Sequence, residues 1–216
     1  VVMTNPLYVE REIEHQWRDA GCTVAITTDA SWVTCLRSIR NRLPVEHYVL
    51  ASIPEYLRQP LRTLACITLR LRRPPLVASV APGPGVHRWR ELLRGTEASV
   101  PAARGTLPIG MDDLAVLQYT GGTTGVPKAA MLTHRNVSCN AQQVASWFVD
   151  AVPGREVMMG CLPIFHVFGM TVAMNFPLII GGAIVLIPDP RDIPGMIQAV
   201  ARHKVTLFPG VPQMFG

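Results

Sequence analysis

The chain has few charged residues and few aromatic residues. Of its 216 residues, 16% are charged and 6% are aromatic, whereas 49% are hydrophobic. A composition this apolar argues against a disordered chain and supplies a core for one large domain, or for one and a half. The net charge of +5 is mild, so its placement along the chain is more informative than its size.

Acidic residues are absent between Tyr56 and Arg90. This stretch contains Arg58, Arg62, Arg70, Arg72, Arg73, Arg88 and Arg90. Leucines and isoleucine interleave with the arginines from Arg58 to Arg73, which suits peripheral association with an anionic membrane on its cytoplasmic face. A solvated, variable surface segment is the simpler alternative, which we favour at this point. Nucleic acid is not an expected partner, because no helix-turn-helix, zinc or stacking-aromatic pattern accompanies the charge.

Paired cysteines are also lacking. The five cysteines are Cys22, Cys35, Cys66, Cys139 and Cys161. None forms a CxxC pair, so we expect no metal site and no disulfide framework, only core thiols in a reducing compartment. We expect no signal peptide and therefore a cytoplasmic location.

One uncharged run, Met170 to Pro188, is long enough to span a bilayer. Asn175, Pro177 and Gly181-Gly182 interrupt it, and the segment from Ala183 to Ile187 has the β-branched character of a buried strand. We therefore expect a helix, a turn and a strand inside a globular core.

Signals for strands and helices alternate along the rest of the chain. The expected strands are 24–27, 48–51, 157–162, 183–187 and 205–208, with a strand end at 1–3. The expected helices are 9–20, 32–43, one capped by Thr133 and one capped by Asp192. Prolines and glycines predict a loop-rich region over 74–85. This alternation predicts an α/β fold of mostly parallel sheets flanked by helices.

The most informative segment is LQYTGGTTGVPKAAMLTHRNV, from Leu117 to Val137. An apolar strand leads into a loop that combines backbone freedom, hydroxyl groups and one cation, as a polyphosphate site requires. The candidate binding residues are Thr120, Gly121, Gly122, Thr123, Thr124, Gly125 and Lys128. The P-loop of NTPases is excluded, because Pro127 precedes the lysine and Ala129 follows it where that motif has Gly and Ser or Thr. A plain flexible connector is the remaining alternative.

Tyr119 to Lys128 resembles the signature loop of adenylate-forming (AMP-binding) enzymes, and its flanks are most similar to bacterial long-chain fatty-acid–CoA ligases. Further similarity lies at Asn5–Tyr8, Leu162–Gly169 and Pro209–Pro212. The likeness is weak from about residue 57 to 103, and Ala129 departs from the family's usual glycine. It implies a partial N-terminal AMP-binding domain over 1–216, with a first α/β part at 1–56, a basic, proline-rich variable segment at 57–110 and a phosphate-loop α/β part at 111–216.

The resemblance implies an ATP-dependent acyl-CoA synthetase that uses Mg²⁺ and coenzyme A and activates a long-chain fatty acid as its acyl adenylate. The loop and Lys128 would hold the β- and γ-phosphates. His166 would lie beside the acyl carboxylate, although a core histidine in an apolar stretch is an equal alternative. Lys128 and His166 are therefore the candidate catalytic residues.

Several family motifs are missing between Lys128 and Gly216. Neither the aromatic-Gly-x-Thr-Glu string for adenine and Mg²⁺ nor the Thr-Gly-Asp string for ribose occurs there, and we expect the small C-terminal domain to be absent as well. We therefore expect a fragment that is inactive alone. Two alternatives stay open: a non-enzymatic remnant that binds anions, acyl groups or membrane, and another adenylating subfamily, such as an aryl-acid ligase or a peptide-synthetase domain.

Overall fold

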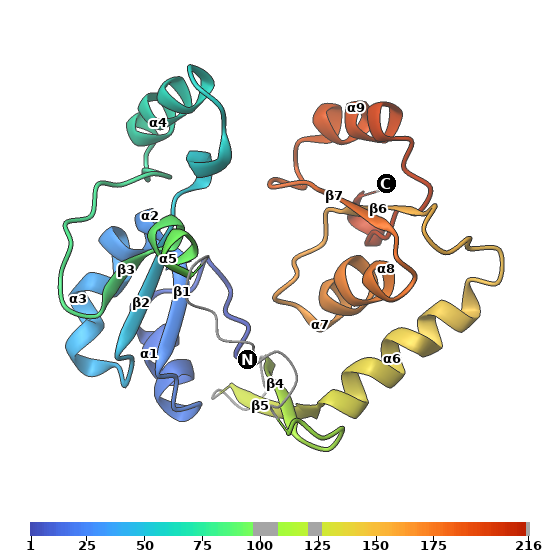
Figure 1. Cartoon of the computed structure of the whole chain (residues 1–216), viewed down its shortest axis with the longest axis horizontal. Helices are drawn as coiled ribbons and strands as arrows, with labels where there is room; N and C mark the ends of the chain where they lie inside the picture. Colours follow the sequence, from blue (N-terminus) through green and yellow to red (C-terminus); the bar gives the residue numbers. More distant parts are fainter. Residues whose placement is uncertain (97–107, 121–126, 215–216) are drawn as a thin grey trace. The chain divides into compact units, whose positions relative to one another are not determined.

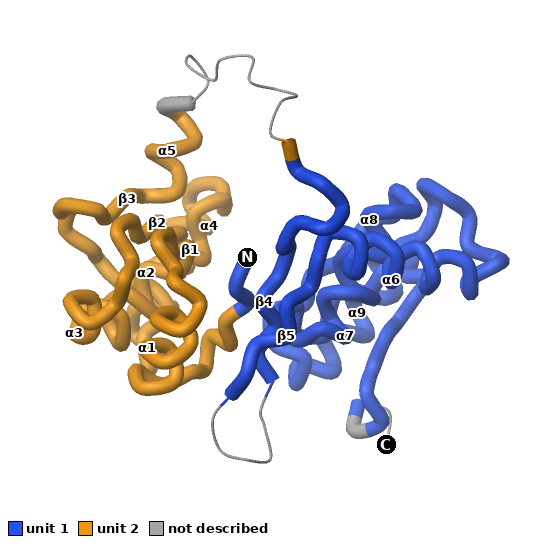
Figure 2. The backbone as a smooth tube through the Cα atoms, turned by 90° about the horizontal axis from the view of Figure 1, so that it is seen from below, with its two compact units in different colours: residues 1–3, 109–216 blue, residues 4–108 orange. Residues whose placement is uncertain are grey.

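The structure is a computed structural model that describes residues 1–96, 108–120 and 127–214. The chain divides into two compact units (Figure 2). Unit 1 comprises Val1–Met3 and Ile109–Gly216, and unit 2 comprises Thr4–Pro108. Each unit is described by itself below.

Unit 2 is built on a three-stranded parallel sheet with β2 in the centre. Its strands are β1 (Val24–Thr28), β2 (His47–Ala51) and β3 (Val86–Arg88). Gly85, directly before β3, has a φ of +70°, and a Cβ at this position would collide with the carbonyl oxygen of Glu46. The entry to β3 therefore requires glycine, both for the backbone conformation and for the close approach.

Eight helical segments accompany this sheet in the described part of unit 2. They are α1 (Glu10–Asp19), α2 (Asp29–Ser31), η1 (Trp32–Leu36), α3 (Arg37–Ile39), η2 (Arg40–Arg42), η3 (Ile53–Tyr56), α4 (Leu61–Leu71) and α5 (Trp89–Thr96) (Figure 1). The helix expected over 32–43 thus begins earlier, at Asp29, and changes its winding along the way. Glu14 and Arg18 form an ion pair one turn apart on α1, with 3.3 Å between the charged atoms.

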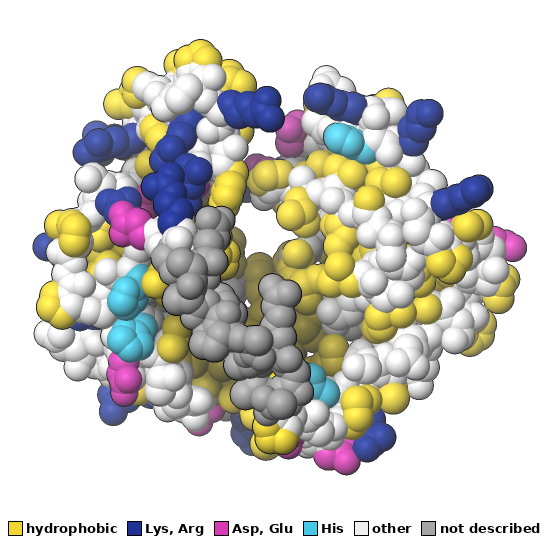
Figure 3. All heavy atoms as spheres, viewed as in Figure 1, with side chains coloured by type: hydrophobic (Ala, Val, Ile, Leu, Met, Phe, Trp, Pro, Cys, Tyr) yellow, Lys and Arg dark blue, Asp and Glu magenta, His cyan; other side chains and the backbone are white. Residues whose placement is uncertain are grey.

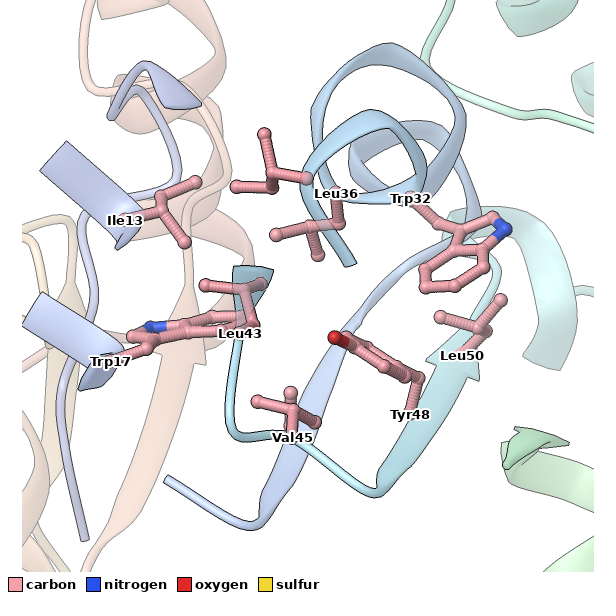
Figure 4. Close-up of a cluster of buried hydrophobic side chains, with 10 residues drawn as sticks. Ile13, Trp17, Trp32, Leu36, Leu43, Val45, Tyr48 and Leu50 are labelled. Carbon is pink, nitrogen blue, oxygen red and sulfur yellow. The ribbon is translucent and has the colours of Figure 1, made fainter. Parts of the chain in front are cut away.

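The core of unit 2 is one cluster of ten buried hydrophobic residues between the sheet and α1 to α3 (Figure 4). Trp32 packs against Tyr48 with ring centroids 4.8 Å apart. Figure 4 shows the Tyr48 hydroxyl pointing into the cluster, and it has no hydrogen-bond partner among the described residues. Burial raises the pKa of this hydroxyl, partly offset by the positive charge of Arg40.

The segment expected to be variable, 57–110, contributes regular structure to unit 2. It supplies β3, which pairs with β2, and the helices α4 and α5. Residues 72–85 contain no helix or strand, as the prolines and glycines predict. The three-part division of the chain stays a prediction.

The described part of unit 1 contains two strand pairs. β4 (Leu114–Thr120) and β5 (Lys128–Thr133) are antiparallel, whereas β6 (Val157–Gly160) and β7 (Ala183–Leu186) are parallel. Val2 forms a parallel bridge to Leu117, as a strand end. No strand was expected between the phosphate loop and the helix capped by Thr133, so β5 is a difference. Its alanine-containing sequence, KAAMLT, has no alternation that would mark a strand.

The helical segments of unit 1 are α6 (His134–Trp147), α7 (Val167–Gly169), η4 (Met170–Asn175), α8 (Phe176–Ile179), α9 (Ile193–His203) and η5 (Pro212–Met214). Both expected caps are confirmed: Thr133 accepts from the Asn136 N–H at 3.2 Å, and Asp192 accepts from the Gly195 N–H at 3.0 Å. The strand expected over 205–208 is present only as a bridge between Met158 and Leu207.

The long uncharged run folds as expected, into η4, α8, a turn and β7. Among the described residues, no helix combines the length and the apolar character needed to cross a bilayer. All five cysteines are free. The expectation of core thiols is correct for the buried Cys161 and wrong for the exposed Cys139.

Candidate active site

The two ends of the expected phosphate loop lie opposite each other at one end of the β4–β5 hairpin. Thr120 is the last residue of β4 and Lys128 the first of β5, and they are cross-strand partners. The Thr120 hydroxyl donates to the Lys128 carbonyl oxygen over 3.5 Å, and both residues are exposed. The hairpin thus brings one of the expected hydroxyls and the expected cation to the same edge.

Five of the expected binding residues lie outside the described residues. They are Gly121, Gly122, Thr123, Thr124 and Gly125. Their assignment to a phosphate site stays a prediction, as do the roles of Thr120 and Lys128.

The other end of the hairpin is fixed by an ion pair between Arg135 and Asp112. The guanidinium donates twice to the carboxylate, at 2.8 and 2.9 Å, and the Arg135 N–H also bonds the Met111 carbonyl at 2.7 Å. The hydrogen bonds from Arg135, followed by its charge, lower the pKa of Asp112. These contacts fix the start of α6 beside the hairpin. Arg135 is therefore paired with Asp112, at the end of the hairpin opposite to Lys128.

His166 stands at the start of the short helix α7. Its Nδ1 accepts a hydrogen bond from the Phe168 N–H at 3.2 Å. When the imidazole is neutral, this bond puts its proton on Nε2, which leaves Nε2 as a donor for a negatively charged oxygen. The ring is exposed, so His166 is not a core histidine.

The His166 segment borders a cavity of about 560 Å³ in unit 1. The lining is mostly apolar: Cys161, Leu162, Pro163, Phe165, His166, Phe168, Gly169, Pro190, Arg191, Ile193, Val211 and Met214. A volume of this size suits a small-molecule ligand. The Arg191 guanidinium is held by Asp189, with 2.9 and 3.1 Å between donor and acceptor atoms.

Two details shape the wall of this cavity. A Cβ on Gly169 would collide with the Pro163 carbonyl oxygen, so α7 can lie this close to the preceding turn only with glycine there. Burial raises the pKa of the Cys161 thiol, which donates to the Pro209 carbonyl at 3.4 Å. Cys161 is therefore a neutral part of the wall at neutral pH.

Gln118 connects the hairpin to this cavity. Its side chain is buried, and its Nε2 donates to the Phe165 carbonyl oxygen at 3.0 Å. The bond starts two residues before Thr120 and ends one residue before His166. The amide oxygen of Gln118 has no hydrogen-bond partner among the described residues. Sequence reasoning missed this residue, although a polar side chain inside an apolar strand was a visible signal.

The whole chain, residues 1–216, matches the sequence profile of the AMP-binding enzyme family. The chain belongs to this family. The resemblance seen in the Thr/Gly loop is thereby confirmed, and the mostly parallel sheets with their helices confirm the α/β fold class.

Curated relatives of this AMP-binding chain include long-chain-fatty-acid–CoA ligases. The chain is 35% identical to that of Bacillus subtilis and 34% to that of Escherichia coli O157:H7, and it aligns over its entire length. It is 31% identical to 4-coumarate–CoA ligase 1 of Oryza sativa subsp. japonica over 98% of the chain. The chain spans 37% of the length of the first two relatives and 33% of the third.

Solved structures support the same fold. The anthranilate CoA ligase AuaEII in complex with anthranoyl-AMP superimposes with a TM-score of 0.74 at 23% identity, over 99% of this chain and 35% of that one. The N-terminal domain of FACL13 from Mycobacterium tuberculosis superimposes with a TM-score of 0.61 at 20% identity, over 99% of this chain and 43% of that one.

Proposed function

We propose that this AMP-binding chain holds the phosphates and part of the acyl group in an acyl-CoA ligase acting on a long-chain fatty acid in the cytoplasm. In the proposed first step, the fatty-acid carboxylate attacks the α-phosphorus of ATP, which gives acyl-AMP and pyrophosphate. In the second step, the thiol of coenzyme A takes the acyl group and AMP leaves. The identities to long-chain-fatty-acid–CoA ligases support the substrate class.

The observation that carries the proposal is the hydrogen bond from Gln118 to Phe165. It joins the strand that leads to the Thr/Gly loop to the segment that carries His166 and lines the cavity. A ligase must present a carboxylate to a phosphate, so it needs a phosphate-binding segment fixed next to an acyl-binding one. This bond supplies such a fixed connection inside unit 1.

The loop residues fit a polyphosphate by their chemistry. An anionic carboxylate that approaches a triphosphate is repelled, and preorganised donors and cations lower that barrier. Thr120 and Lys128 would contribute a hydroxyl and an ammonium group at the hairpin edge, together with the loop between them. Mg²⁺, where it binds with ATP, supplies further positive charge on the phosphate oxygens. Each lost charge-assisted donor should cost about 1.5–3 kcal/mol.

His166 would act on the acyl side. With Nδ1 occupied by the Phe168 N–H, its Nε2–H would donate to the carboxylate and hold it in line with the α-phosphorus. The apolar lining of the cavity next to it would accept the first part of the alkyl chain.

The decisive experiment is Lys128→Ala in the full-length protein, with the two half-reactions measured separately. Adenylate formation, followed by ATP–pyrophosphate exchange, should fall by about 10- to 150-fold. Transfer from preformed acyl-AMP to coenzyme A should change little. Equal slowing of both half-reactions would refute the role of Lys128. Lys204→Asn is the matched control: it removes a lysine from the end of α9, and asparagine tolerates the left-handed backbone there (φ 50°).

An aryl acid is the second candidate substrate. The 31% identity to 4-coumarate–CoA ligase 1 favours it, and a cavity with Phe165 and Phe168 in its wall suits a ring. Rates of the full-length protein with long-chain, short-chain and aryl acids distinguish the two candidates. If kcat/KM is higher for the aryl acid than for the fatty acids, the aryl acid is the substrate.

A further inference from the structure

Helix α4 of unit 2 has its apolar face turned outward. Its large apolar side chains Leu61, Leu64, Ile67 and Leu71 are 60%, 60%, 54% and 77% exposed. They recur every three or four residues and therefore share one face of the helix. The half-buried face is made of Arg62, Ala65, Cys66 and Leu69, so the face toward the unit is no more apolar than the face toward solvent. A helix that only covers a protein core shows the opposite distribution.

Basic residues flank this face in the sequence, and no acidic residue occurs from Leu57 to Arg90. Arg58 precedes α4, Arg70 lies in its last turn, and Arg72 and Arg73 follow it. None of these four arginines forms an ion pair in the part of the chain that the structure describes. Figure 3 shows hydrophobic side chains at the end of unit 2 where α4 lies, with Lys and Arg side chains grouped beside them.

We propose that α4, with its flanking arginines, is a docking surface for an anionic phospholipid membrane. The helix would lie in the plane of the interface, with Leu64, Ile67 and Leu71 among the upper acyl chains. The arginines would reach the lipid phosphates while their own apolar stems stay at the boundary.

A lipid surface fits this combination better than another macromolecule does. A protein partner, or another part of the same polypeptide, would need a matching row of carboxylates around an apolar groove. A nucleic acid would use the arginines and leave Leu64, Ile67 and Leu71 in water. An anionic bilayer alone offers a continuous negative layer directly above an apolar one. The inference does not rest on the ligase function, because no residue of α4 belongs to the candidate active site.

The test is flotation of the full-length protein with vesicles of phosphatidylcholine containing about one-third phosphatidylglycerol, compared with pure phosphatidylcholine. Binding should require the anionic lipid and should weaken as salt is raised. Binding that is equal on both vesicles, or absent on both, would overturn the proposal.

Two sets of variants separate charge from apolar insertion. Neutralising Arg70, Arg72 and Arg73 with glutamine should weaken binding by about 100-fold, since each basic side chain near such a surface is worth about fivefold. The control is a triple variant with the same change in net charge at exposed positions outside α4: Arg11→Gln, Arg37→Gln and Arg155→Gln. This variant should keep most of the binding to the vesicles.

Leu64→Ser with Ile67→Ser should weaken binding by at least about tenfold. Its control is Leu178→Ser with Ile197→Ser, at positions 62% and 65% exposed in unit 1, which should leave binding unchanged. A loss with the arginine variant alone would indicate binding by charge only and would contradict insertion of α4. A large fall in thermal stability of the Leu64/Ile67 variant would show that protein covers this face, and would also overturn the proposal.

Discussion

Unit 2 and unit 1 differ in how their buried hydrophobic residues are grouped. Unit 2 buries ten hydrophobic residues in one cluster beneath its parallel sheet, whereas the core cluster found in unit 1 has three buried members: Met159, Cys161 and Met196. Yet unit 1 carries every described candidate site residue, together with the large cavity. Other buried hydrophobic residues of unit 1, such as Ala141, Ala173 and Phe176, do not belong to that cluster, so the core of unit 1 is divided where that of unit 2 is continuous.

Truncation of one buried side chain in each unit should give the largest effects. Leu36→Ala should lower the free energy of unfolding by about 4–5 kcal/mol, because the buried side chains around it cannot move far enough to fill the cavity left behind. Met159→Ala should cost about 2–3 kcal/mol, because its half-buried neighbours can relax. Urea unfolding followed by circular dichroism measures both. A larger loss for Met159→Ala would remove the distinction between the two cores.

An added methyl group at one glycine of each unit should give intermediate effects. Gly169→Ala should lower the free energy of unfolding by about 1–3 kcal/mol, because the new Cβ would collide with a carbonyl oxygen. Gly85→Ala should lower it by more, because Gly85 has a positive φ in addition to such a collision. The melting temperatures of the two variants measure this difference. Gly169→Ala should also raise KM for the acid, since Gly169 lines the cavity, whereas Gly85→Ala should leave KM unchanged. A KM change at Gly85 alone would reverse the division of roles.

The smallest effect concerns a surface carboxylate of unit 1. The Thr206 hydroxyl and the Val152 N–H donate to Glu156 at 2.5 and 2.8 Å, and they lower its pKa in that order of importance. A lowered pKa in the folded state stabilises the fold above the ordinary glutamate range, and this stabilisation is lost as the pH falls through the folded pKa.

Glu156→Gln should therefore lower the melting temperature slightly at neutral pH and leave it unchanged in acid. Melting curves across a pH series check this, with Asp150→Asn as a control of equal charge change at an exposed neighbour. A difference that persists in acid would assign the effect to geometry and not to charge.

The sequence was sufficient where local chemistry decides the structure. The helix expected over 9–20, the caps Thr133 and Asp192, and the β-branched strand from Ala183 each depend on near neighbours, and each was found. The ends of the Thr/Gly loop were also found, because glycine, threonine and lysine in that order form an unusual pattern.

Features fixed by distant partners were missed. β5 exists because its residues pair with β4, while its own alanines favour a helix. The strand expected over 205–208 is only a bridge, although its residues favour a longer one. The role of Gln118 depends on a carbonyl 47 residues further along the chain, and no local pattern encodes that contact.

The strand end at Val1–Met3 has a consequence for the order of folding. Val1 bonds to Ala115 and Val2 pairs with Leu117, although the next hundred or so residues belong to unit 2. During synthesis Val1–Met3 cannot pair until β4 has left the ribosome, by which time residues 4–108 have been made. Unit 2 can therefore fold before the strand end at Val1–Met3 finds its partner in unit 1.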